Sequence, residues 1–318
     1  MPRGADTFLL ELFVIFVCAK VCGEIFEKLS LPAVVGEILA GVILGPYAAG
    51  LVTPSGTVES LAEIGAIFLL FTVGLEIRPQ ELIRVGRQAL TVAASGVAFP
   101  FLLGFGYLAL RGAPLHESIF VGAAMVATSV GITARVLSDL GALNSRVARI
   151  ILGAAVFDDI LGMVVLTVVT GLAAAGTIRW WHLGVLLVEA LGFAVFMILV
   201  GPRVVHRMRP GLQRMSTQNA PLVLSLALCL GLSVAATKIG MAAIIGAFFA
   251  GLVFADYSPE WNLHPRINAI TELLAPFFFF VMGASQCRYE GFKSQSRMAE
   301  EFESWEFLRC WIGLSSKQ

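Results

Sequence analysis

Two neighbouring carboxylates, Asp158 and Asp159, lie in the middle of a long apolar stretch of the sequence. One charge at the centre of a bilayer costs ~2.5–3.5 kcal/mol on insertion scales, so two such charges indicate a function. Carboxylates this close titrate as a coupled pair. If one carboxylate binds either a proton or a cation, the proton and the cation compete for a single site. That competition is the minimum that an antiporter needs. The alternative is a buried ion pair with a structural role only.

A second candidate segment precedes the acid pair and contains Thr128 and Ser129. The stretch 128–131 combines β-branched, hydroxyl and glycine residues, which favour an unwound segment over a helix centre. Unwound backbone offers carbonyl and hydroxyl oxygens to a hard cation. The alternative is that the hydroxyls bond back to their own helix. Arg135 follows, and we expect it to neutralise a carboxylate or to lie near the cytoplasmic end.

The composition places these residues in a membrane. The 318 residues are 58% hydrophobic and 14% charged, with a net charge of zero and a mean hydropathy of +0.85. Soluble domains carry roughly 25% charged residues. The composition therefore argues against a soluble enzyme, a disordered protein or a nucleic-acid-binding protein. The five cysteines have no zinc-site spacing, and we expect no cofactor.

Ten apolar segments predict an all-α polytopic membrane protein. They cover residues 8–28, 32–49, 58–77, 87–110, 117–138, 147–172, 180–203, 219–237, 241–256 and 268–285, of which the second and ninth are short for a bilayer. Alternate connections carry eleven and four Lys or Arg residues. The first set is expected to be cytoplasmic and the N-terminus external.

The sequence also contains an internal repeat. Residues 36–41 match residues 246–251 at an offset of 210, and Gly74 in the following segment matches Gly283 at an offset of 209. Seven segments separate the matched pairs, and an odd number reverses direction across the membrane. The pattern therefore predicts inverted repeats, an architecture typical of secondary transporters. Short glycine matches that arise by chance are the alternative.

Three motifs together resemble the cation:proton antiporter-2 family of sodium/hydrogen exchangers, which includes Kef-type potassium systems. They are residues 34–41, 127–135 and 155–162. The resemblance implies crossed discontinuous helices in a core domain that moves like an elevator against a dimerising domain. It assigns ion and proton binding to Asp159, and pairing with a lysine on a later helix to Asp158. It also implies a monovalent cation (sodium first) and protons as substrates, a homodimer, and the inner membrane of a bacterium-like cell.

The family has about thirteen helices, so the resemblance implies that three helices should follow residue 285. Residues 286–318 instead carry 10 charges in 33 positions. We therefore expect a transmembrane exchanger domain over residues 1–285 with an incomplete second repeat. The polar tail over 286–318 is expected to be aberrant, and the chain truncated at its C-terminus.

Two other functions stay open. A Kef-like potassium efflux system fits the same scaffold, but it usually has a soluble nucleotide-binding domain, and Kef proteins more often show Gln-Asp than Asp-Asp. An inactive truncated fragment is the second alternative. Enzymatic activity is not expected, since no nucleophile–base pair or phosphate loop is present. The remaining intramembrane acids are interpreted as helix-pairing residues and not ion ligands: Glu37, Glu63, Glu76 and Glu189.

Overall fold

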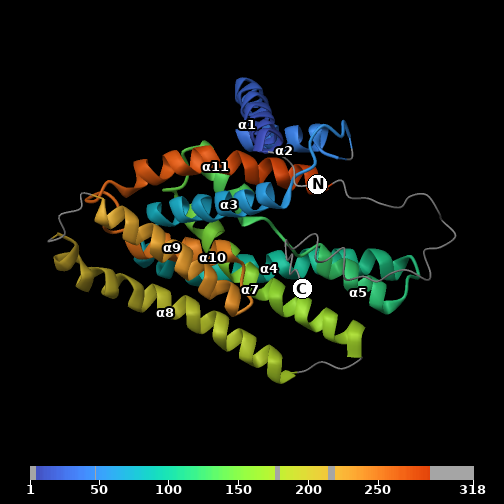
Figure 1. Cartoon of the computed structure of the whole chain (residues 1–318). Coiled ribbons are helices and arrows are strands. Elements are labelled where there is room, and N and C mark those ends of the chain that lie inside the picture. Colours follow the sequence, from blue (N-terminus) through green and yellow to red (C-terminus); the bar gives the residue numbers. More distant parts are fainter. Residues whose placement is uncertain (1–4, 47, 176–179, 214–218, 287–318) are drawn as a thin grey trace. The chain divides into compact units, whose positions relative to one another are not determined.

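The computed structural model describes residues 5–46, 48–175, 180–213 and 219–286, and within them it is all-helical. Figure 1 shows the helices, which are α1 (Ala5–Lys28), α2 (Ala33–Leu44), α3 (Gly56–Glu76), α4 (Pro79–Leu110), α5 (Leu115–Ala124), α6 (Val130–Asp139), α7 (Arg146–Ala175), α8 (Trp180–Gln213), α9 (Ala220–Lys238), α10 (Ala243–Phe254) and α11 (Leu263–Gln286). The polar tail predicted over 286–318 lies outside the described residues except for its first residue. The predicted division into two domains at residue 285 therefore stays a prediction.

Several helices differ in extent from the ten predicted segments. The segment 117–138 forms two helices, α5 and α6, so the described residues contain eleven helices. Helix α4 begins at Pro79 where residue 87 was expected, and α8 continues to Gln213 where residue 203 was expected. Apolar runs report only the part of a helix that lies in lipid. Both helices continue beyond the apolar run into charged sequence. This is possible because the backbone hydrogen bonds of a helix form within the helix itself, in water as in lipid.

Within the described residues, six helices are long and apolar enough to cross a membrane: α3, α4, α7, α8, α9 and α11. Helix α1 is not one of them, because Glu11, Lys20 and Glu24 interrupt its apolar sequence. The two helices expected to be short, α2 and α10, have 12 residues each. At 1.5 Å per residue such a helix is ~18 Å long, well below the ~30 Å of a bilayer core.

The described chain divides into two compact units, and each of α3 and α11 contributes residues to both. In the first unit, α1 packs against α2. Gly36 makes this approach possible, because an added Cβ there would clash with the backbone of Cys22. Gly41 lies against the Phe280 carbonyl in the same way, and Gly283 against that of Ile38. The interface between α2 and α11 is therefore a close backbone contact.

The second unit, Ala66–Thr271, has the same packing at equivalent positions. Gly246 lies against the backbone of Leu232, and Gly251 lies against the carbonyl of Phe71 on α3. Each of these glycines is 210 residues after its counterpart in the first unit. The turns that precede α2 and α10 agree as well, since Ser30 and Gly240 have positive φ values of 61° and 82°. This recurrence supports the predicted repeat, while its inverted orientation stays a prediction.

Candidate ion-binding site

The two adjacent acids lie near the middle of α7, the 30-residue helix Arg146–Ala175. One turn before them, Gly153 and Ala154 pack against Ala89 of α4. Small residues on both helices allow this close packing, which fixes the position of α7. The side chains of Asp158 and Asp159 are both half-buried. Consecutive side chains on a helix point about 100° apart, so the two carboxylates face different surroundings.

The unwound segment predicted before the acid pair is present. Helix α5 ends at Ala124 and α6 begins at Val130, so Met125–Ser129 form a non-helical break. The break begins three residues earlier than expected, and Val130 and Gly131 are helical. Ser129 precedes α6 with an extended backbone, at φ −100° and ψ 106°.

The break and the acid pair meet through one hydrogen bond. The Thr128 hydroxyl donates to Oδ2 of Asp158, 30 residues along the chain. The structure therefore brings Thr128 and Asp158 together. Thr128 lies in the break, where the backbone is not helical. Ser129 is half-buried beside Thr128, and its side chain does not cap α6. A hydroxyl that bonds back to the backbone is found one turn later, at Thr133, which donates to the carbonyl of Ser129 at 3.2 Å.

Arg135 neutralises a carboxylate, as predicted, but not one of the acid pair. Its Nε lies 3.0 Å from Oδ1 of Asp139, one turn further along α6. Both side chains are partly buried, with exposed fractions of 14% and 18%. The charge of Arg135 is therefore engaged within α6.

Two cavities lie along α7 before the acid pair. The larger has a volume of about 760 Å³ and is lined by both polar and apolar residues, with the charged Arg149 on α7 and Glu76 on α3 among them. The smaller is an apolar cavity of about 10 Å³ lined by Leu152 and Val156 of α7 and Phe248 of α10. Along α7 the order is thus polar cavity, apolar layer and acid pair.

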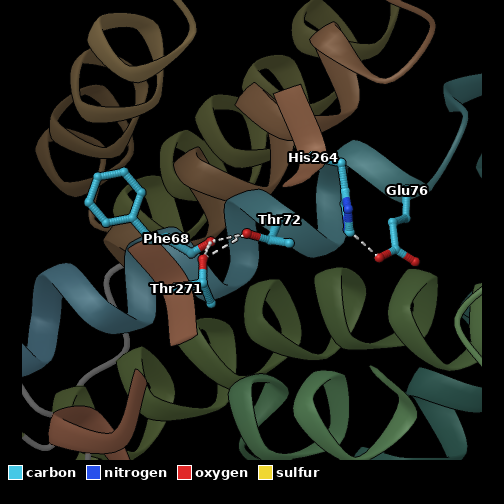
Figure 2. A network of polar contacts seen from close by, with 5 residues as sticks. All are labelled: Phe68, Thr72, Glu76, His264 and Thr271. Carbon is cyan, nitrogen blue, oxygen red and sulfur yellow. Dashed lines mark hydrogen bonds and ion pairs between the residues drawn. The ribbon is translucent and has the colours of Figure 1, made fainter. Parts of the chain in front are cut away.

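Of the other acids, Glu37 and Glu76 pair with residues of neighbouring helices. Glu37 on α2 is 1% exposed and has Lys20 of α1 at 3.7 Å. Glu76, at the end of α3, has Nε2 of His264 at 2.6 Å. Figure 2 shows this second pair at the start of α11. This partner could not be predicted from the sequence, because 188 residues separate Glu76 from His264.

The same two helices share a second polar contact that sequence reasoning missed. Figure 2 shows Thr72 of α3 and Thr271 of α11 with their hydroxyl oxygens side by side, at 2.8 Å. Both hydroxyls also lie within reach of the Phe68 carbonyl, at 2.9 Å and 3.2 Å. Each hydroxyl has one proton to donate. The shortest contacts are satisfied when Thr271 donates to the Thr72 hydroxyl and Thr72 donates to the carbonyl of Phe68. Both threonines are buried.

The protein-family comparison decides what kind of protein carries this site. The model of the transmembrane sodium/hydrogen exchanger family matches residues 13–287, which is most of the chain. The chain belongs to this family. The predicted membership, the all-α fold and the multi-pass membrane location are therefore confirmed.

Individual family members agree with this assignment. The chain is 36% identical to the high-affinity Na⁺/H⁺ antiporter NhaS3 of Synechocystis sp., over 87% of this chain and 68% of that protein. It is 33% identical to the probable Na⁺/H⁺ antiporter GerT of Bacillus cereus, over 91% and 76%. The solved structure of the sodium proton antiporter MjNhaP1 from Methanocaldococcus jannaschii has the same fold, with a TM-score of 0.57 at 23% identity, covering 87% of this chain and 69% of that one. The family consists of transporters that exchange cations for protons.

Proposed function

We propose that this family member exchanges sodium for protons, and that Asp159 is the group that carries both in turn. The observation that supports this most is the contact of the α5–α6 break with the acid pair, made by Thr128 and Asp158. Unwound backbone therefore lies beside Asp158, the first of two adjacent acids in an apolar helix. Carbonyl oxygens of a broken helix and carboxylate oxygens are the donors that transporters use for sodium.

The two acids have different roles in this proposal. Asp158 accepts a hydrogen bond from the Thr128 hydroxyl, so one of its oxygens is already engaged. Asp159 is the next residue on α7, about 100° further around the helix, and we assign the proton and the cation to its carboxylate. Thr128 and Ser129 would add oxygen ligands from the break when the cation binds. A cation that enters displaces the proton, and a proton that returns displaces the cation.

Exchange also requires that the acids be reached from one side at a time. The polar cavity next to Arg149 is the approach from one side, and the apolar layer of Leu152, Val156 and Phe248 is the barrier between it and the acids. The positive-inside count places this approach on the cytoplasmic side. Movement of the apolar layer would then open the site. A homodimer in a bacterial inner membrane is part of the same proposal.

The test is ion exchange in proteoliposomes that contain the purified protein. A sodium gradient should drive proton movement in the opposite direction, and Asp159→Asn should abolish it, because an amide neither binds a proton nor offers a charge to sodium. The matched control is Asp139→Asn, which removes an acid that pairs with Arg135 outside the site. Undiminished exchange by the Asp159→Asn protein would refute the assignment. Potassium or rubidium flux without proton coupling would instead favour the Kef-like alternative.

A further inference from the structure

Helix α8 buries one face against α10 and exposes the opposite face. Gly201 lies against Val253 of α10, where an added Cβ would clash with the valine side chain. Phe193 of α8 and Phe249 of α10 pack edge to face, with ring centroids 5.8 Å apart. Val205, one turn after Gly201, is buried on the same side. These contacts fix which face of α8 points away from α10.

The exposed face is apolar in the part of α8 that can cross the membrane. Val188, Phe196 and Leu199 have exposed fractions of 72%, 53% and 48%. At 100° per residue they lie within about 80° of one another around the helix. From Val188 to Leu199 the helix rises by about 17 Å, which is close to half of the ~30 Å hydrocarbon core. This face therefore matches the length of one lipid leaflet.

The same face ends in two arginines. Arg203 and Arg207 follow Leu199 at intervals of four residues, which keeps all three on one side of the helix. Both arginines are exposed, and the apolar span of α8 ends at Arg207. Arg203 donates a hydrogen bond to the Leu199 carbonyl, and a guanidinium has five N–H donors in all. The sequence has no acidic residue from 190 to 255, so the charge at this end of α8 is positive.

Two aromatic residues of the α10–α11 connection lie beside this basic end. Nδ1 of His206, the neighbour of Arg207, lies 2.7 Å from the Tyr257 hydroxyl. Tyr257 stacks on Trp261, with ring centroids 5.2 Å apart. Tyrosine and tryptophan are enriched where lipid headgroups meet water. Their presence here places the two arginines at headgroup level.

We propose that this end of α8 binds an anionic phospholipid. Arg203 and Arg207 bind the phosphate of its headgroup, for which the planar guanidinium is well suited. One acyl chain lies along the apolar face between Val188 and Leu199. The positive-inside count places this lipid in the cytoplasmic leaflet. The inference goes beyond the proposed exchange function and does not depend on it, because lipid binding requires no transport.

The experiment measures the binding of phosphatidylglycerol to the purified protein in detergent, by native mass spectrometry and by the rise in Tm. Zwitterionic phosphatidylcholine is the comparison lipid. A cation beside an anionic headgroup contributes about fivefold in affinity. The double variant Arg203→Gln/Arg207→Gln should therefore bind phosphatidylglycerol about five- to thirtyfold more weakly, with its binding of phosphatidylcholine unchanged. Arg203→Lys/Arg207→Lys keeps both charges and should keep most of the affinity.

The matched control is Arg84→Gln/Arg87→Gln on α4, which removes two exposed arginines on the same predicted side of the membrane. Its affinity for phosphatidylglycerol should equal that of the wild-type protein. Equal losses in the two glutamine variants would show only a general attraction to anionic lipid and would overturn the site. Undiminished binding by Arg203→Gln/Arg207→Gln would do the same. An equal rise in Tm with inorganic phosphate at the same concentration would assign the arginines to a soluble anion and refute the lipid.

Discussion

At the scale of single residues, the hydrogen bond from Thr128 to Asp158 is the contact on which the candidate site depends. It leaves the neighbouring Asp159 as the acid without a bond from the break. A hydroxyl that donates to a carboxylate also holds that carboxylate in one orientation. The proposed function accordingly gives the two acids different roles, with Asp158 positioned by Thr128 and Asp159 exchanging the ion and the proton.

Removing this hydroxyl should weaken sodium binding without abolishing exchange. Thr128→Val keeps the branched shape and deletes the donor, and hydrogen bonds to charged groups contribute about 1.5–3 kcal/mol when buried. Because Thr128 is exposed, we expect a smaller effect, with the KM for sodium raised about three- to tenfold. The KM is measured from exchange rates at increasing sodium concentrations.

The control for this prediction is Thr133→Val. Thr133 lies one turn into α6, and its hydroxyl donates to the backbone carbonyl of Ser129 and not to a carboxylate. Its replacement should leave the KM for sodium unchanged. Equal effects of the two substitutions would mean that the Thr128 hydroxyl has no special role.

The residues at the centre of the site could be predicted from the sequence because their signal is local. Two acids in an apolar run are costly wherever the chain folds, so Asp158 and Asp159 stand out without a structure. The pairing of Glu76 with His264 could not be found in this way. It depends on α3 and α11 lying together, and each residue alone looks like an ordinary polar residue at a helix end.

At the scale of helices, close backbone contacts at glycine organise both units. Gly251 on α10 has no room for a side chain, because a Cβ there would clash with the carbonyl oxygen of Phe71 and with Gly74. The neighbouring atoms are backbone, which cannot rotate out of the way. These contacts explain why the short helices α2 and α10 have glycine at equivalent positions.

Gly251→Ala should therefore destabilise the protein by about 1–3 kcal/mol, the usual cost of overpacking. The fall in Tm in detergent is the measurement. Gly231→Ala is the control, because Gly231 on α9 has open space around it. Alanine there should leave the Tm unchanged or raise it, since glycine in a helix interior costs up to about 1 kcal/mol relative to alanine. A Gly251→Ala protein as stable as the control would contradict the close contact.

Helix positions were predictable from apolar runs, and helix ends were not. The runs located the membrane part of α4 and α8 but missed the charged turns that extend them, because hydrogen bonding along a helix continues in water. The break between α5 and α6 was predicted from residue type alone. Its exact start was not, since any of several neighbouring residues can take the extended backbone.

At the scale of the whole molecule, the sequence and the family comparison agree on a membrane exchanger of the sodium/hydrogen type. Exchange without another energy source requires that loading one substrate unload the other. The proposed function assigns that requirement to the acid pair of α7. It therefore depends on competition between a proton and a sodium ion at Asp159.

The most direct measurement of this competition is proton release when sodium is added to the purified protein in weakly buffered detergent solution. We predict that sodium binding releases protons from the wild-type protein, and that the Asp159→Asn protein releases none. The Asp139→Asn protein should release as many protons as the wild type. Sodium binding without proton release, or equal release by the Asp159→Asn protein, would contradict the central claim.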